Sequence, residues 1–253
     1  MNKTNFIKKS IILIGLLILF VITACGSESE ESENTVHKVD NEEKEEKSED
    51  ENDVLAALNE LARNSTDTEE IYITDEIIVG QEEEVKPGIY DLEITGGSGN
   101  IFGERSDIMF LDINWIGGTE GNDMGDPSKI RIILFEEDRL EFSDISKVKF
   151  NAVPEEVDPS NELGIGEFIV GRDIMPGDYK LSTNVEMDPE FENLGWNISI
   201  YNDEKGKQRD QMFTATNDDV LVSLKEGEII SLFYDNIDYE SSADEAKLIF
   251  TEK

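Results

Sequence analysis

Cysteine and histidine are nearly absent from this chain of 253 residues, which contains only Cys25 and His37. Both precede the strand-like part of the sequence, where neither a disulfide framework nor thiol chemistry is therefore expected. That part also lacks the base that a nucleophilic triad needs and the nitrogen or sulfur ligands that zinc prefers. Glycine-rich phosphate loops and Rossmann fingerprints are missing as well. We expect no enzyme of these classes, and only a carboxylate-dependent hydrolase stays open.

Basic residues are also scarce, since 22 lysines and arginines stand against 59 acids and give a formal net charge of −37. Residues 1–24 contain three lysines and no acid, so the chain from Cys25 onward is more acidic still. Such a surface repels nucleic acid and anionic lipid headgroups. Nucleic acid is therefore not expected as a partner, whereas cations and basic surfaces are allowed.

Long apolar runs are limited to one segment near the N-terminus. Residues 11–22 form an apolar run of twelve, interrupted only by Gly15, and Lys3, Lys8 and Lys9 precede it. The run is shorter than the roughly 20 residues that a membrane-spanning helix needs. Its layout is that of a secretory signal peptide.

The run leads into Ile22-Thr23-Ala24-Cys25, which resembles a bacterial lipobox. In that family the leader is cleaved after the small residue, here Ala24, and the cysteine is alkylated with diacylglycerol and becomes the mature N-terminus. The resemblance implies that residues 1–24 are a lipoprotein signal peptide and that Cys25 carries a lipid anchor. Each buried methylene of such an anchor contributes about 0.8 kcal/mol. The expected location is the extracytoplasmic face of the cell membrane.

Residues 25–52 have low complexity and contain no aromatic side chain. They cannot bury enough apolar surface to offset their ordering entropy, so we expect a disordered acidic tether in which His37 is solvated. Residues 53–65 then predict a short amphipathic helix with Asp53 as its N-cap. Its apolar face consists of Val54, Leu55, Leu58, Leu61 and Ala62. At about three turns it needs to dock on the following domain or it frays.

The rest of the chain contains one pattern twice. Ile78-Val79-Gly80 leads to Pro87-Gly88-Ile89-Tyr90, and Ile169-Val170-Gly171-Arg172-Asp173-Ile174 leads to Pro176-Gly177-Asp178-Tyr179. Three further matches follow in the same order, ending with Lys147-Val148-Lys149-Phe150 against Lys247-Leu248-Ile249-Phe250. The order indicates a duplication, with copies at residues 66–156 and 157–253.

Each copy has the pattern of short strands. Tyr90, Leu92 and Ile94 alternate with polar residues, as do Tyr179 and Leu181, which predicts one buried and one exposed face. The prolines of Pro-Gly are expected to fix φ in a turn whose glycine accepts a positive φ. The links at 136–138 and 226–228 are expected to be hairpin turns. The sequence predicts a mainly β fold of two tandem, small antiparallel β-sandwich or jelly-roll-like domains.

The complete pattern in the second copy, Val-Gly-x-Asp-Ile-x-Pro-Gly-x-Tyr, looks like a repeat that is common in exported lipoproteins of Gram-positive bacteria. The resemblance covers most of residues 71–250 and implies no catalytic residues, because that family has no defined activity. The first copy has Gln81-Glu82-Glu83-Glu84-Val85 where the second has Asp173-Ile174. The roles of the two loops are therefore not expected to be equal. We interpret as structural the motif residues Gly80, Pro87, Gly88, Tyr90, Gly171, Asp173, Pro176, Gly177 and Tyr179.

Two features suggest ligands. In residues 117–126 the oxygens of Glu120, Asn122, Asp123 and Asp126 suit calcium, although the spacing is not that of an EF-hand and an acidic surface loop is the alternative. Trp115 and Trp196 suit a sugar-stacking platform, with core packing as the alternative.

Together these patterns predict a lipid-anchored, non-catalytic binding or structural protein of unknown ligand. A calcium- or glycan-binding module and a carboxylate-dependent hydrolase are the alternatives. Two copies would give avidity toward a repetitive partner, such as a cell-wall polymer or a neighbouring surface protein.

Overall fold

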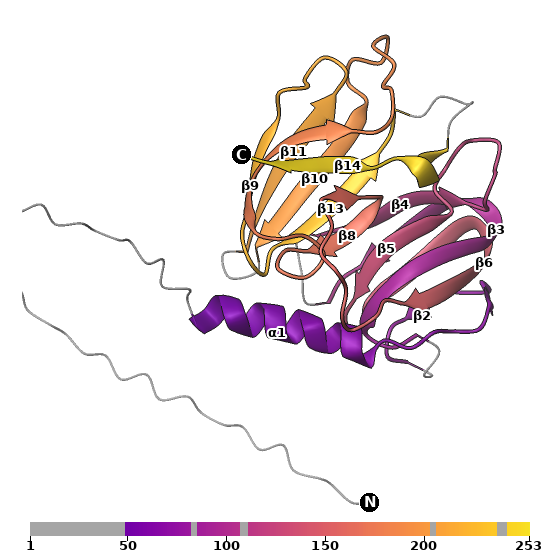
Figure 1. The fold of residues 1–253 in the computed structure, drawn as a ribbon. Coiled ribbons are helices and arrows are strands. Elements are labelled where there is room, and N and C mark those ends of the chain that lie inside the picture. Colours follow the sequence, from indigo (N-terminus) through magenta and orange to yellow (C-terminus); the bar gives the residue numbers. More distant parts are fainter. Residues whose placement is uncertain (1–48, 82–84, 107–110, 203–205, 237–241) are drawn as a thin grey trace, which may run out of the picture. The chain divides into compact units, whose positions relative to one another are not determined.

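The computed structural model describes residues 49–81, 85–106, 111–202, 206–236 and 242–253. These form a mainly β fold with one α-helix and two hydrogen-bonded sheets, and they belong to one compact unit, Glu45–Lys253 (Figure 1). The lipobox-like Ile22-Thr23-Ala24-Cys25, His37 and most of the tether lie outside the described residues. No helix within the described ranges is both long enough and apolar enough to cross a membrane.

The helix α1 (Glu49–Asn64) begins earlier than the sequence predicted, so Asp53 lies inside the helix and is not its N-cap. The helix docks as expected. Its buried Leu58 and Ala62 pack in a small apolar cluster with Ile89 and Ile169, one from each copy.

Residues 66–156 are called the first half and residues 157–253 the second half. The strands of the first half are β1 (Ile71–Tyr72), β2 (Ile77–Ile78), β3 (Gly88–Glu104), β4 (Ile113–Gly118), β5 (Lys129–Leu134) and β6 (Arg139–Ala152). The long strands β3 and β6 pair along their whole length, with register shifts where glycines interrupt β3. Gly97 has φ +86°, and a Cβ there would lie 2.2 Å from the carbonyl oxygen of Asp144. Glycine therefore permits the close approach of the two strands at this point.

The described residues of the second half form eight strands and a 3-10 helix, η2 (Ala243–Glu245). The strands are β7 (Glu162–Leu163), β8 (Gly166–Ile169), β9 (Gly177–Thr183), β10 (Gly195–Asn202), β11 (Lys207–Thr214), β12 (Leu221–Leu224), β13 (Ile229–Tyr234) and β14 (Leu248–Glu252). A four-stranded sheet has the order β12-β9-β14-β7, while β8, β13, β10 and β11 belong to a ten-stranded sheet. In Figure 1, β14 crosses in front of β10 and β11, as the two layers of a sandwich do.

Corresponding strands of the two halves pair in the same way. β6 lies between β1 and β3 through Ile71↔Val148 and Leu92↔Phe150. In the second half, β14 lies between β7 and β9 through Leu163↔Leu248 and Leu181↔Phe250. The two halves thus follow one pairing scheme.

The two motif tyrosines also make the same contacts. Tyr90 meets Phe150 edge to face at 5.7 Å between ring centroids, and Tyr179 meets Phe250 at 5.8 Å. Each tyrosine hydroxyl donates a hydrogen bond to the carbonyl oxygen four residues earlier, at 2.9 Å in the first half and 2.8 Å in the second. Both rings are buried, which confirms the predicted inward face of these strands.

The turn glycines differ from the prediction. Gly88 and Gly177 open strands β3 and β9, and neither has a positive φ. The positive φ values belong to Gly80 (+82°) and Gly171 (+93°), which follow the preceding strand in each half. The turn is therefore made before the Pro-Gly pair rather than by it.

The links at 136–138 and 226–228 are not hairpin turns, because the strands on either side of each link do not pair with each other. β5 pairs with β3 and β8, not with β6. β12 pairs with β9 in the four-stranded sheet, whereas β13 belongs to the ten-stranded sheet. Buried carboxylates hold these links instead. Asp138 accepts from the backbone N–H of Phe135 at 2.9 Å, and Glu228 accepts from that of Lys225 at 2.9 Å.

The halves meet where β5 runs parallel to β8. Arg131 lies opposite Gly166, and its backbone N–H donates to the carbonyl oxygen of Ile165 at 3.3 Å. Gly166 has φ +128°, and a Cβ there would lie 2.3 Å from the carbonyl oxygen of Arg131. One sheet therefore continues from the first half into the second, and one apolar cluster contains residues of both. We refer to this junction as the seam.

Candidate functional site

A buried charged cluster fixes the seam beside β5. Arg105 donates to the carbonyl oxygens of Leu111 and Ile133, both at 2.7 Å, and to Asp138 at 3.2 Å. It also donates to Glu167 of β8, whose second carboxylate oxygen accepts from the backbone N–H of Ile133 at 2.8 Å. Burial raises the pKa of the Glu167 carboxyl, and the adjacent guanidinium acts in the opposite direction. Because its charges are paired within the protein, we interpret this cluster as structural.

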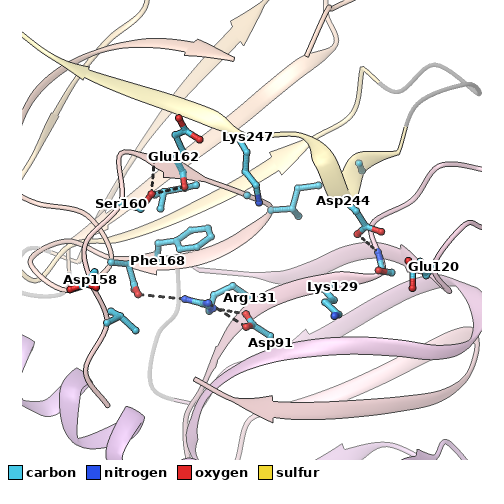
Figure 2. Close-up of a pocket in the computed structure, with 17 residues that line it drawn as sticks. Asp91, Glu120, Lys129, Arg131, Asp158, Ser160, Glu162, Phe168, Asp244 and Lys247 are labelled. Atoms are coloured by element: carbon cyan, nitrogen blue, oxygen red, sulfur yellow. Dashed lines mark hydrogen bonds and ion pairs between the residues drawn. The ribbon is translucent and has the colours of Figure 1, made fainter. Parts of the chain in front are cut away.

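A cleft of about 610 Å³ opens along the seam (Figure 2). Its walls come from both halves and include Asp91, Lys129 and Arg131 of the first half and Phe168, Asp173 and Lys247 of the second. The volume lies in the range of about 300–1,000 Å³ that is usual for small-molecule sites. We refer to it as the junction cleft.

Arg131 is the fixed centre of the junction cleft. Its Nε and Nη2 donate to the two carboxylate oxygens of Asp91 at 2.6 and 3.3 Å, and its Nη1 donates to Asp173 at 3.4 Å. The guanidinium carbon lies 5.5 Å from the centroid of the Phe168 ring, within cation–π range. The two-point contact with Asp91 and the ring together hold the guanidinium in one orientation.

Asp173 joins Arg131 to a second arginine. The same carboxylate oxygen that faces Arg131 lies 3.3 Å from Nη1 of Arg172, and the other oxygen accepts from the backbone N–H of Ile169 at 2.8 Å. Burial raises the pKa of this carboxyl, while the Ile169 N–H and the two arginines lower it. The motif aspartate therefore makes a hydrogen bond within its own loop and also lines the cleft, which was not predicted.

Acidic side chains lie around this centre. In Figure 2, Asp158 and Glu120 lie at opposite ends of the cleft, and the carboxylate of Glu162 turns away from it. Asp244 at the start of η2 accepts from the backbone N–H of Ser128 at 2.6 Å. The cleft thus has basic side chains in its middle and free carboxylates at its ends.

The four residues predicted to bind calcium have separate roles. The side-chain oxygen of Asn122 accepts from two backbone N–H groups, those of Met124 and Asp126, at 3.1 Å each. Glu120 lines the junction cleft, Asp123 is exposed, and burial raises the pKa of the Asp126 carboxyl. In the part of the chain that the structure describes, no group of three or more acidic, histidine or cysteine residues is placed to hold a metal ion.

The same loop contributes to the seam. The carbonyl oxygen of Gly125 accepts from the backbone N–H of Ala243 in η2 at 2.9 Å. Together with the bond between Ser128 and Asp244, this contact ties the start of β5 to the second half. The loop at 117–126 therefore connects the two halves.

Both tryptophans are buried. The ring of Trp196 packs against Tyr234 at 5.0 Å between centroids, and that of Trp115 packs against Phe233 at 6.3 Å. Their exposed fractions are 0% and 2%, so neither ring presents a face to a sugar. Core packing is confirmed for both.

Sequence reasoning missed Arg131, Asp91, Phe168 and Lys247. Asp91 and Arg131 lie on strands and alternate with apolar residues in the manner of ordinary exposed positions, whereas Phe168 has the pattern of an ordinary core residue of β8. One signal was available, because the chain has few basic residues and Lys129, Arg131 and Lys247 lie within or directly beside segments of alternating or apolar pattern. Comparisons with protein-family models, curated proteins and solved structures found no match to this chain.

Proposed function

We propose that the chain is a lipid-anchored, extracytoplasmic binding protein without catalytic function, which takes one ligand in the junction cleft. The lipobox resemblance supports the anchor at Cys25, and the acidic composition of the following residues supports a tether. The expected location is the outer face of the cytoplasmic membrane.

The main support for this proposal is that residues of both halves line the cleft around Arg131, whose guanidinium is held in one orientation. A ligand in the cleft would touch β3 and β5 of the first half and, from the second, β8 and the residue before β14. Because the seam joins unlike edges of the two halves, the duplication would build a single site and not two equal ones. We therefore propose one ligand for each chain in place of avidity toward a repetitive partner.

The chemistry of the cleft favours binding over catalysis. Arg131, Asp91 and Asp173 are held by one another, so none of them is a free acid, base or nucleophile. Neither histidine nor cysteine occurs after residue 37. A cleft of paired and fixed charges is suited to orienting a polar ligand.

The anchor is tested by replacing Cys25 with alanine in the natural host. The variant is expected to lose lipid labelling and to leave the membrane fraction, whereas His37→Ala in the tether keeps both properties. Lipid labelling that persists in Cys25→Ala would rule out this anchor.

The binding site is tested with the chain from residue 25, in which Cys25→Ser prevents acylation. Amide NMR shifts are recorded with a library of small polar compounds. Compounds that bind are expected to shift the amides of Arg131, Phe168 and Asp173 together. Shifts that are absent, or that gather at another surface, would show that the cleft is not the site.

A further inference from the structure

The two halves use one corresponding lysine in different ways. In the first half, Lys147 lies opposite Tyr72 in the pairing of β1 with β6. Its ammonium is 3.1 Å from a carboxylate oxygen of Glu70 and 5.3 Å from the centroid of the Tyr72 ring. The charge of Lys147 is therefore neutralised and partly covered within its own half.

Lys247 occupies the corresponding place in the second half, but without these partners. The pairing Leu163↔Leu248 places Gly164 where the first half has Tyr72, so no ring covers the lysine. A Cβ on Gly164 would lie 2.9 Å from Nζ of Lys247, so the ammonium rests directly over the glycine. Within the described residues no acidic side chain forms an ion pair with Lys247, and Glu162 turns away from the cleft (Figure 2).

Lys247 instead reaches into the junction cleft toward the wall that carries Arg131 (Figure 2). A guanidinium has five N–H groups, and three of those of Arg131 bind Asp91 and Asp173. Two N–H groups, one on each terminal nitrogen, therefore have no protein partner within the described ranges. Such a pair of donors fits the two oxygens of a carboxylate or phosphate.

The charges around Lys247 and Arg131 leave a local excess of positive charge in the middle of the cleft, although the carboxylates of Glu120, Asp158, Glu162 and Asp244 make the lining acidic as a whole. Asp91 and Asp173 are already paired with Arg131 and Arg172. Among the residues that the structure describes, Lys247 has no such pair, and Lys129 has only a distant one, 3.8 Å from Glu93. The free carboxylates of Asp158 and Glu120 lie at the ends, where they repel long polyanions but leave room for a single anionic group.

We infer that the junction cleft binds its ligand through one carboxylate or phosphate group, seated between the ammonium of Lys247 and the guanidinium of Arg131. The apolar part of the ligand lies against Phe168 and Leu163, which line the same cleft. This inference rests on the proposed binding function and adds the chemical class of the ligand.

The test titrates the chain from residue 25 with Cys25→Ser at low ionic strength, where such contacts are least screened. The probes are N-acetylglycine and glycerol 3-phosphate, with N-acetylglycinamide and glycerol as their neutral counterparts and glycinamide as a cation. Amide NMR shifts report where each probe binds. The two anionic probes distinguish a carboxylate ligand from a phosphate ligand.

Three variants separate the site from general charge effects. Lys247→Met is expected to weaken binding of the anionic probe by about tenfold or more, the usual effect of losing a charged hydrogen bond. Lys147→Met removes the same charge at the corresponding place, and the affinity is expected to stay unchanged. Gly164→Tyr copies Tyr72 into the second half and is expected to block the probe while the melting temperature stays near that of the parent.

The inference is supported if an anionic probe binds saturably at the cleft and its neutral counterpart does not. Binding must also be lost in Lys247→Met and kept in Lys147→Met. Equal losses in Lys247→Met and Lys147→Met would overturn it, as would no binding of either anion. If library compounds or glycinamide occupy the cleft while both anions fail, the ligand class is wrong and the binding site stands. If no compound of any kind binds in the cleft, the proposed function fails as well.

Discussion

Nη1 of Arg131 lies 3.4 Å from a carboxylate oxygen of Asp173, 42 residues further along the chain. Arg131 belongs to β5 of the first half, and Asp173 belongs to the loop after β8 of the second. This contact crosses the seam and lies at the centre of the junction cleft. Asp173 thus accepts a hydrogen bond within its own loop and also contacts Arg131 in the junction cleft.

The parallel pairing at the seam depends on Gly166. Gly166→Ala places a methyl group 2.3 Å from the backbone of β5 at a φ of +128°, so we expect a loss of about 3 kcal/mol. Gly121→Ala is the control, because its φ is also positive (+70°) but nothing lies within 4 Å of the added carbon. Its expected cost is about 1 kcal/mol. Urea denaturation measures both, and equal losses would contradict a special role of Gly166.

The buried charged cluster of Arg105, Asp138 and Glu167 is expected to stabilise the seam. Glu167→Ala removes a carboxylate that is paired with the buried Arg105, and we expect a loss of about 3–5 kcal/mol. Glu76 lies at the corresponding place of the first half, two residues before Ile78 as Glu167 is two residues before Ile169. It forms only a half-exposed ion pair with Arg139, so Glu76→Ala is expected to cost less than about 1 kcal/mol. A small loss in Glu167→Ala, measured by denaturant unfolding, would mean that the cluster does not hold the seam.

The motif tyrosines are predicted to contribute equally. Tyr90→Phe and Tyr179→Phe each remove one hydroxyl bond to a backbone carbonyl and keep the edge-to-face ring contact. Each variant is expected to lose about 1 kcal/mol in thermal or urea unfolding. If one variant lost nothing and the other several times this amount, the two halves would not use the motif in the same way.

The ionisation of Tyr234 is expected to lower the free energy of unfolding at high pH. Burial, with a smaller effect from the charge of Asp235, raises the pKa of Tyr234 to about 12, whereas an unfolded tyrosine has a pKa of about 10. The folded state therefore keeps a proton that the unfolded state loses. This contribution is complete below pH 10 and is lost as the pH rises from about 10 to 12, by up to about 1.4 kcal/mol per pH unit.

Tyr234→Phe removes the titrating hydroxyl and keeps the ring against Trp196. The free energy of unfolding of this variant is expected to fall less steeply between pH 10 and 12 than that of the parent. Tyr72→Phe changes an exposed tyrosine and is the control. Identical pH slopes in the parent and in Tyr234→Phe would contradict the raised pKa.

Local patterns were sufficient to predict much of the fold. The alternation around Tyr90 and Tyr179 predicted the buried faces, because strand period and burial are both properties of a few neighbouring residues. The links at 136–138 and 226–228 were misassigned, since a turn signal does not tell whether the strands on either side pair with each other. The buried carboxylates of Asp138 and Glu228, which hold these links, resemble ordinary surface acids in the sequence.

The junction cleft was not predictable from the same signals. It exists because β5 pairs with β8, and a parallel contact between edges of two halves leaves no periodic pattern in either strand. Gly166, whose backbone approaches that of Arg131 closely, is a local trace of that contact. The lack of an ion pair at Lys247, in contrast to Lys147, depends on which residues the strand pairing places opposite each lysine, and this pairing is not encoded in the local sequence.

The two halves form one body, and we propose that the seam between them makes the binding cleft. Calorimetry of the chain from residue 25, with Cys25→Ser, shows whether the two halves unfold together. One body predicts a single unfolding transition whose calorimetric and van't Hoff enthalpies agree. Two transitions, or a calorimetric enthalpy about twice the van't Hoff value, would mean that the halves unfold separately and that the seam does not join them.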